Sequence, residues 1–374
     1  METAARLPTF STRVTAAEGA ESVPCQRRRR FRDTDTRCSM AGEGTADAPA
    51  DMEGRKATPA PTWYKAPALK LRPEATAEDA LAAAIGNALA HWSGNEACVI
   101  ARAHPEGVHQ MRVATRRLRS RLALYKPLLP EADVKPVQKE LKWLISQLGP
   151  ARDWDVFLQE TWQPVADVLP EEADLALLGE KAERRRNKGY GKAAAALASR
   201  RYRELGAHLS GWATERSWRQ AADVDEAHPA LREPARAFAS RVIEDRHDTV
   251  VTLGRSLADM DAETRHKLRI QIKKLRYAVE FFRSLYSEDA VKPFVRALSS
   301  LQDSLGTMND LAVARDLMDD LCARSAGRTR ARLAFASGVI VGWHLPRMAA
   351  ASPLNGSWAA FEQLPPFWDD KGTV

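Results

Sequence analysis

The chain has 374 residues, a formal net charge of +7 and 28% charged residues. A chain of this length holds one large domain or two medium ones, and its positive charge favours an anionic partner. The four cysteines lie far apart and form no CxxC or Cys/His cluster, which argues for a reducing compartment and against a disulfide framework or a structural zinc site. They are Cys25, Cys38, Cys98 and Cys322.

Residues 1–72 are predicted to be a disordered basic leader. They are rich in Ala, Gly, Pro, Thr and charged residues and show little hydrophobic periodicity. The basic run Arg27–Arg30 lacks the apolar stretch of a secretory signal, and Met40 offers a second plausible start besides Met1. Residues 333–345, the longest apolar stretch, are too few to span a bilayer. We therefore expect a cytoplasmic protein without a membrane partner.

From about Thr76 the chain reads as one helix after another, with few β-branched alternations. This pattern predicts an all-α fold. Gly149-Pro150 is interpreted as a helix stop, and a break is expected around Gly189 and Gly191. Besides two basic helices, helices are expected over residues 76–92, 131–148, 153–168, 175–212 (one long or two medium), 235–253, 291–305, 310–322 and 328–344.

The sequence contains two similar basic stretches, each predicted to be a helix, 157 positions apart. The stretch that starts at His109 reads HQMRVATRRLR, and the stretch that starts at His266 reads HKLRIQIKKLR. Asp153 returns as Asp310 at the same offset. An offset that holds over this distance predicts an internal duplication.

The repeat sets the predicted domain organisation. We expect a helical domain over residues 73–350, with halves at about 73–220 and 228–350 that repeat the helix order. An irregular C-terminal tail is expected over residues 351–374, because it contains prolines and aromatic residues without a helical period.

On a helix at 100° per residue, each copy has two distinct faces. One face is a basic wedge of roughly 80°. The opposite face is apolar, with Met111 and Leu118 in the first copy and Leu268 and Leu275 in the second. The wedges consist of His109, Arg112, Arg116 and Arg119, and of His266, Arg269, Lys273 and Arg276.

Neither basic helix contains an acidic residue: none occurs from Gly107 to Pro130 or from Arg265 to Val279. Ordinary solvated helix faces mix charges, because i,i+4 pairs stabilise a helix and like charges cost a similar amount. A single charge run would favour a solvated face, but two copies in one register favour a polyanion site. Each wedge is about 15 Å long, and arginine suits bidentate phosphate contacts.

The histidines are expected near helix starts, where unpaired N–H groups can hold an anion. Bound phosphate would promote protonation of an imidazole; the alternative is a structural histidine that fixes the local turn. Gly149 and Gly306 are predicted helix C-caps, and Asp153 and Asp310 are predicted caps of the following helices. A structural turn is the favoured reading there, and a minor hypothesis is that the aspartates orient arginines of the basic helices.

Two stretches carry a family resemblance. PEGVHQMRVATRRLR, from Pro105 to Arg119, and residues 266–280, with KKLRY, occur in order at the right separation, followed by Leu305-Gly306 and Asn309-Asp310. They resemble the two signatures of the CHAD family, the conserved histidine α-helical domain. The resemblance covers roughly residues 73–350.

The resemblance implies a helical bundle of two pseudo-symmetric halves. Their paired basic helices would line a central basic channel that binds inorganic polyphosphate without hydrolysing it, and such proteins can be recruited to polyphosphate granules. The long leader departs from the family pattern, and no Glu-x-Glu-x-Lys motif of a tunnel-type phosphohydrolase occurs. The motif assigns the ligand role to His109, Arg112, Arg116, Arg117, Arg119, His266, Arg269, Lys273, Lys274 and Arg276, with Arg117 and Lys274 at the border of the wedge.

Nucleic-acid binding is the strongest alternative, since it uses the same electrostatics. Against it, the basic helices lack interleaved aromatic residues, and no helix-turn-helix or zinc-finger pattern occurs. A metal phosphohydrolase would have only the bare pair His247-Asp248, without converging ligands. An adaptor that docks an acidic protein is a third reading. We expect a non-catalytic protein with no cofactor and no metal, and its oligomeric state stays open.

Overall fold

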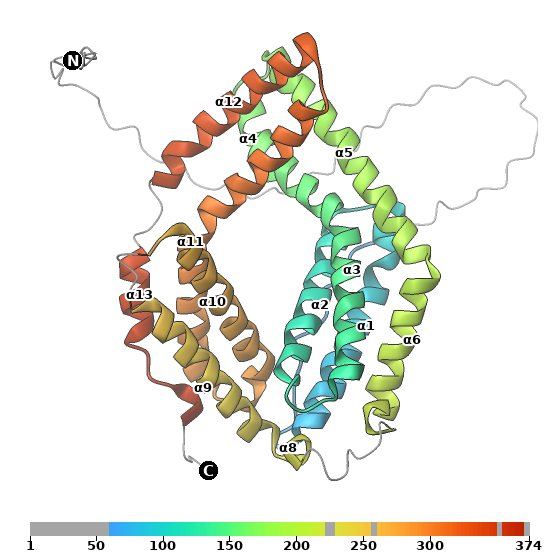
Figure 1. Cartoon of the computed structure of the whole chain (residues 1–374), viewed down its shortest axis with the longest axis vertical. Coiled ribbons are helices and arrows are strands. Elements are labelled where there is room, and N and C mark those ends of the chain that lie inside the picture. The colour runs from blue at the N-terminus through green and yellow to red at the C-terminus, as the bar shows by residue number, and fades with distance from the viewer. Residues whose placement is uncertain (1–59, 221–228, 256–259, 350–353, 370–374) are drawn as a thin grey trace, which may run out of the picture. The chain divides into compact units, whose positions relative to one another are not determined.

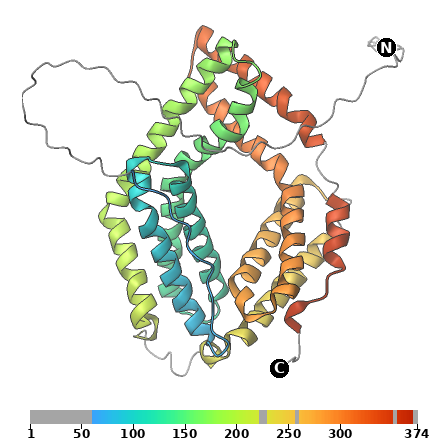
Figure 2. The same cartoon turned by 180° about the vertical axis from the view of Figure 1, so that it is seen from behind.

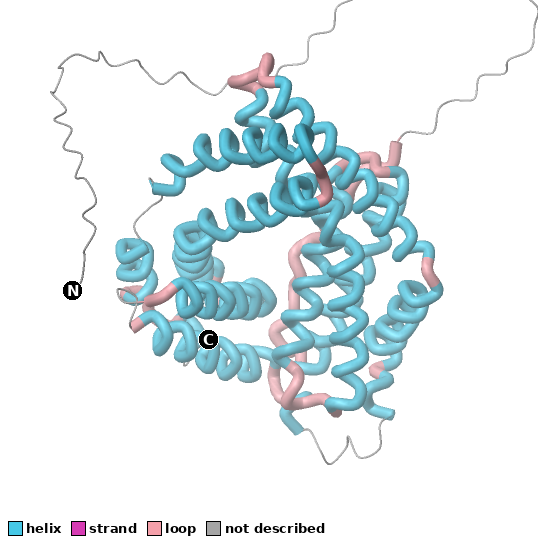
Figure 3. Tube along the Cα trace, turned by 45° about the horizontal axis from the view of Figure 1, so that its top comes forward, coloured by secondary structure: helices cyan, strands magenta, loops and turns pink. Residues whose placement is uncertain are grey.

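A computed structural model describes residues 60–220, 229–255, 260–349 and 354–369. Every regular element in these ranges is a helix, as Figure 3 shows. The one β-type contact among them is an isolated bridge between Thr76 and Pro234. The predicted all-α fold is therefore confirmed.

The N-terminal helices form one group (Figures 1 and 2). Helix α2 (Pro105–Leu124) packs against both α1 (Ala77–Ala101) and α3 (Glu131–Val156). Helix α5 (Ala173–Ala198) covers α3, and α6 (Arg200–Glu215) covers α1. Since α2 has neighbours on two sides, its apolar face is buried and its basic face is left for other contacts.

The C-terminal helices form a second group. Helix α10 (Ala262–Phe282) packs against α9 (Ala235–Gly254) and α11 (Glu288–Ala323), and α12 (Gly327–Ala349) packs on the far end of α11. The shorter elements are η1 (Phe157–Trp162, a π-helical turn), α4 (Gln163–Ala166), η2 (Ser217–Gln220), α8 (Pro229–Arg232), η4 (Arg283–Leu285), α13 (Leu354–Glu362) and η5 (Phe367–Asp369).

The helix starts repeat at the offset of the sequence repeat. Helix α10 begins 157 residues after α2 (262 − 105), and α11 begins 157 residues after α3 (288 − 131). Helix α9 begins 158 residues after α1 (235 − 77). The order α1–α2–α3 is thus matched by α9–α10–α11; that it arose by internal duplication stays a prediction.

One continuous core joins the two groups and sets α2 beside α10. The buried ring of Tyr125, at the end of α2, lies 4.8 Å from Phe238 of α9, which lies 5.9 Å from Phe282 of α10. A second core contains Trp154 and Met318 and forms where the ends of α3, α5, α11 and α12 meet. Because each core takes residues from both groups, burial of apolar surface fixes the separation of the two basic helices.

Helix α3 does not end at Gly149, as was predicted, but runs on through Pro150, and α11 likewise runs through Gly306. A proline inside a helix leaves the carbonyl four residues earlier without its N–H donor. Here the Lys192 ammonium donates to the Ser146 carbonyl at 3.4 Å. Tertiary contacts therefore stabilise a helix that local rules would end. The predicted C-caps are wrong, and so are the predicted caps at Asp153 and Asp310, which lie inside α3 and α11.

Helix α5 continues through Gly189 and Gly191 instead of breaking there. A Cβ at position 189 would lie 2.6 Å from the backbone nitrogen of Ala151, so this glycine permits close packing of α5 on α3. The break comes at Ser199, whose hydroxyl accepts a hydrogen bond from the backbone N–H of Tyr202 at 3.2 Å and caps α6.

Residues 354–362 of the predicted irregular tail form helix α13. Its Trp358 and Phe361 are buried: the Phe361 ring lies 5.4 Å from Phe294 of α11, and the Trp358 indole lies against Gly254 of α9. These aromatic contacts fold the segment onto the second group. Residues 351–353 and 370–374 of the tail lie outside the described residues.

Residues 60–72 of the predicted disordered leader form an extended segment packed on the helices. Tyr64 and Asn95 of α1 exchange hydrogen bonds of 3.0 and 2.7 Å between backbone and side chain. The backbone N–H of Leu71 donates to the Ser284 hydroxyl at 2.9 Å, and the Leu71 side chain is buried. The segment therefore links α1 to the end of α10, and the prediction is wrong for these residues; residues 1–59 lie outside the described ranges.

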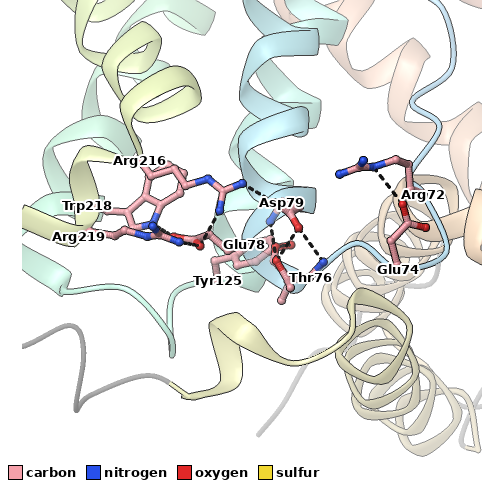
Figure 4. A network of polar contacts seen from close by, with 10 residues as sticks. Arg72, Glu74, Thr76, Glu78, Asp79, Tyr125, Arg216, Trp218 and Arg219 are labelled. Carbon is pink, nitrogen blue, oxygen red and sulfur yellow. Dashed lines mark hydrogen bonds and ion pairs between the residues drawn. The ribbon is translucent and has the colours of Figure 1, made fainter.

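A polar network anchors the start of α1 (Figure 4). The buried carboxylate of Glu78 accepts hydrogen bonds from the Trp218 indole at 2.8 Å and from the guanidiniums of Arg216 and Arg219. Asp79 also pairs with Arg216. Since the donors lie at the end of α6 and in η2, the network closes one end of the first helix group.

Candidate functional site

A groove of about 950 Å³ lies between the two basic helices, with walls from α2, α3, α9 and α10. Among the described residues its lining contains seven cationic side chains and one acidic side chain, Glu131. Such an excess of one charge between low-dielectric walls concentrates anions. The cationic residues of this groove are Arg116, Arg119, Lys126, Lys135, Arg246, Lys273 and Lys274.

The predicted wedge of α2 faces this groove. Arg116 and Arg119 line it and are exposed. His109 and Arg112 lie further toward the start of α2, on the same face by helical periodicity. His109 is the fifth residue of the helix, one turn past the free N–H groups, and the N-cap is His104, whose Nδ1 accepts from the N–H of Glu106. His109 therefore lies inside α2, after the N-terminal N–H groups at which an anion was expected to bind.

Arg112 is held in place by α3. Its guanidinium donates to the Ile145 carbonyl at 3.2 Å and lies 3.7 Å from the Asp153 carboxylate. Burial lowers the pKa of Arg112, and Asp153 opposes that shift. The hypothesis that Asp153 orients an arginine of the basic helix is confirmed in the first copy; the side chain of Asp310 lies outside the described residues.

His109 is neutral at neutral pH. Burial and the neighbouring cations Arg152, Arg116 and Arg112 lower its pKa to about 4, against the opposing effect of Glu106. At neutral pH the imidazole can thus accept a proton only when negative charge enters its surroundings.

Helix α10 presents a different part of its wedge to the groove. Lys273 and Lys274 line it, together with Ile270 and Tyr277. Arg276 forms an ion pair of 3.2 Å with Glu280, and the Nε of Arg269 is buried without a hydrogen-bond partner. His266 is exposed, one turn inside α10, whose N-cap Asp261 accepts a hydrogen bond from the N–H of Thr264 at 2.7 Å.

The two helices therefore do not use matched positions. At 100° per residue, the groove-lining direction of α10 is rotated by roughly 60° relative to that of α2. As a result, Lys274 lines the groove while its counterpart Arg117 does not, and Arg119 lines it while its counterpart Arg276 does not. The equal wedges expected from the repeat are only partly reproduced.

Sequence reasoning missed four cations near the site. Lys126 follows α2, Lys135 lies on α3 and Arg246 lies on α9, where burial lowers its pKa. Arg152, on α3, acts on His109. Each lies outside the basic repeat. Lys126 belongs to the acid-free stretch that ends at Pro130, but the segments around Lys135, Arg152 and Arg246 contain acidic residues, so no local charge pattern marks those three. One signal was available for Arg152: it lies between Leu148-Gly149 and Asp153, which recur as Leu305-Gly306 and Asp310 at the offset of 157.

Other candidate chemistry stays apart from the groove. His247 lies among aromatic rings, 5.0 Å from Trp368 and 5.7 Å from Phe361. Within the described residues no cluster of three or more His, Cys, Asp or Glu side chains could hold a metal, and Cys98 and Cys322 are free thiols. None of the described helices combines the length and the apolar character needed to cross a membrane.

Comparison with known proteins places these features in a family. The CHAD domain profile matches residues 83–319. The crystal structure of the CHAD domain from the plant Ricinus communis aligns with a TM-score of 0.68 at 32% identity, over 82% of this chain and 98% of that one. PptA from Streptomyces chartreusis shares the fold, with a TM-score of 0.53 at 16% identity over 78% of this chain and 99% of its own.

Two uncharacterized proteins from strains of Mycobacterium tuberculosis are 29% identical over 229 residues. The aligned part is 59% of this chain and 42% of those proteins. The chain thus spans less than half the length of these curated relatives.

Proposed function

This chain belongs to the CHAD domain family, which is associated with polyphosphate binding in general, and we propose that it binds inorganic polyphosphate in the cationic groove between α2 and α10. The proposed role is binding without hydrolysis. The observation that carries the proposal is the concentration of seven cations around one groove that contains a single acid, among the described residues.

The geometry suits a flexible chain of phosphates. Arg116 and Arg119 are exposed on one wall and can make bidentate contacts, while Lys273 and Lys274 on the facing wall act as point charges. A phosphate chain threaded between the walls would contact both helices at once. Because these contacts release counterions, binding weakens as salt rises.

His109 and Arg112 would extend the path toward the start of α2. The imidazole is neutral in the free protein, and a phosphate beside it would favour the protonated form and add one positive charge. Recruitment to polyphosphate granules would follow from the same binding and belongs to the proposal.

The first test is calorimetric titration with long-chain polyphosphate at two salt concentrations. In the variant Arg116→Glu/Lys273→Glu we expect the affinity to fall about 100-fold or more, since two charge-assisted contacts become repulsive. The matched control is Arg184→Glu/Arg200→Glu, which changes the net charge equally at exposed positions on α5 and α6. Similar losses in both variants would refute the groove as the binding site.

Two further experiments test the alternatives of nucleic-acid binding and of polyphosphate hydrolysis. Duplex DNA of equal phosphate content should bind much more weakly than polyphosphate; equal binding would bring nucleic acid forward as the partner. Prolonged incubation with polyphosphate should release no orthophosphate, and sustained release by the wild-type chain would contradict a non-catalytic role.

A further inference from the structure

A second, smaller pocket opens on a different face of α2, roughly 120° around the helix from the groove. Its volume is about 180 Å³, below the roughly 300–1,000 Å³ of pockets for drug-sized ligands. Part of its wall is the extended segment of residues 67–69, which does not reach the groove. Tyr277 of α10 lines both pockets.

Two arginines of α2 dominate the charge of this pocket. Arg121 is only 9% exposed, and its guanidinium lies over the Phe281 ring, 4.9 Å from the ring centroid. Arg117 lies one helical turn earlier, close enough to affect the titration of Arg121. Within the described residues, neither guanidinium has a hydrogen bond or an ion pair.

The other charges of the pocket are already compensated. Glu280 forms its ion pair with Arg276, and Arg283 forms one with Glu288. An ordinary protein interior pairs its buried guanidiniums, because an uncompensated buried charge is costly. Glu280 also acts electrostatically on Arg121, but its carboxylate is shared with Arg276, so Arg117 and Arg121 lack a paired anion of their own.

We propose that this pocket is a second anion site, which holds a single phosphate group against Arg117 and Arg121. A phosphate group carries an average charge of about −1.5 to −2 near pH 7, which matches two guanidiniums better than the single charge of a carboxylate does. Free orthophosphate and the terminal phosphate of a short polyphosphate present the same chemistry to this pocket. The site does not depend on polyphosphate binding in the groove.

The test is titration of the full chain with orthophosphate, at constant ionic strength set by sodium chloride, followed by calorimetry and by the melting temperature. The variant Arg121→Gln should weaken the orthophosphate affinity about tenfold or more. The groove variant Arg116→Glu/Lys273→Glu should retain this binding. Loss in the groove variant together with retention in Arg121→Gln would overturn the proposal.

Because Arg121 is buried, a second variant avoids the core. Ala68 is exposed on the extended segment and lines the pocket. Ala68→Asp would place a carboxylate beside the arginines and compete with phosphate, while the matched variant Ala68→Asn should bind as the wild type does. Equal phosphate binding by Ala68→Asp and Ala68→Asn would contradict the assignment.

Tripolyphosphate distinguishes the two sources of the phosphate group. If the pocket takes a chain end, tripolyphosphate should compete with orthophosphate in the groove variant, where the larger site is disabled. If it takes only free orthophosphate, tripolyphosphate should not compete there. Acetate at the same concentration should have no effect; displacement of phosphate by acetate would show a general anion pocket and overturn the phosphate assignment.

Discussion

The Nη2 of Arg112 and the Oδ1 of Asp153 lie 3.7 Å apart where α2 packs on α3. Burial raises the pKa of Asp153 and lowers that of Arg112, and each residue opposes the shift of the other. The attraction between the two charges thus offsets only part of the free-energy cost of removing them from water, as is common for buried ion pairs. The carboxylate orients the guanidinium but also competes with any phosphate that approaches it.

We therefore expect Asp153→Asn to strengthen polyphosphate binding severalfold at low salt. The amide keeps a carbonyl oxygen as an acceptor for Arg112, while the competing negative charge is removed. Calorimetry at two salt concentrations measures the effect, and the gain should shrink at the higher concentration. Asp319→Asn, an exposed change on α11, supplies the same charge difference as a control. A loss of affinity in Asp153→Asn would mean that orientation by the carboxylate matters more than competition.

Polyphosphate binding should be coupled to proton uptake by His109. The pKa of His109 in the free protein is about 4, and a bound phosphate raises it, so the complex holds more protons than the free protein at pH values between the free and the raised pKa. Affinity should consequently rise as pH falls from neutral toward the free pKa of about 4. Titrations in buffers of different ionisation enthalpy count the protons, and His109→Gln should take up fewer than the wild type. An unchanged proton count in that variant would exclude His109 as the acceptor.

Helical periodicity predicted much of this protein, because it reflects which face of a helix is buried. The apolar faces of α2 and α10, including Met111 and Leu268, are fully buried. The acid-free faces carry Arg116 and Lys273 into one groove. Both features are local properties of a helix and can be read from spacing alone.

The remaining features depend on contacts between helices. By local rules, Gly149-Pro150 should end α3. The helix continues because Lys192, more than forty positions later, donates a hydrogen bond to the Ser146 carbonyl that Pro150 leaves without a donor. The rotation of α10 that brings Lys274 to the groove depends on how α10 packs on its neighbours. No spacing within one helix encodes such contacts.

The network at the start of α1 should contribute measurably to stability. Hydrogen bonds from Trp218 and Arg219 keep the pKa of Glu78 below its ordinary value of 4.5 despite burial. Glu78→Gln should lower the free energy of unfolding at pH 7 by about 2 kcal/mol, a figure reduced for the partial exposure of the arginines. Glu204→Gln, in an exposed pair, should change it by less than about 0.5 kcal/mol. Urea unfolding measures both.

The effect of Glu78→Gln should also depend on pH. A carboxylate with a lowered pKa contributes stability above its unfolded pKa, and that contribution is lost as pH falls through the folded value. The difference between wild type and variant should therefore narrow as pH falls below about 4.5. A difference that stays constant down to pH 3 would assign the loss to packing and not to charge.

The close packing of α5 on α3 makes Gly189 a sensitive position. A Cβ there would lie 2.6 Å from the backbone nitrogen of Ala151, and backbone cannot move aside as a side chain can. Gly189→Ala should destabilise the fold by about 1–3 kcal/mol through overpacking, even though alanine favours a helix. The matched change Gly86→Ala, where nothing lies within 4 Å of the new Cβ, should instead stabilise α1 by about 0.5–1 kcal/mol. Urea midpoints that shift in opposite directions would confirm that the glycine is required for helix contact; stabilisation by both changes would mean that α3 and α5 can separate at no cost.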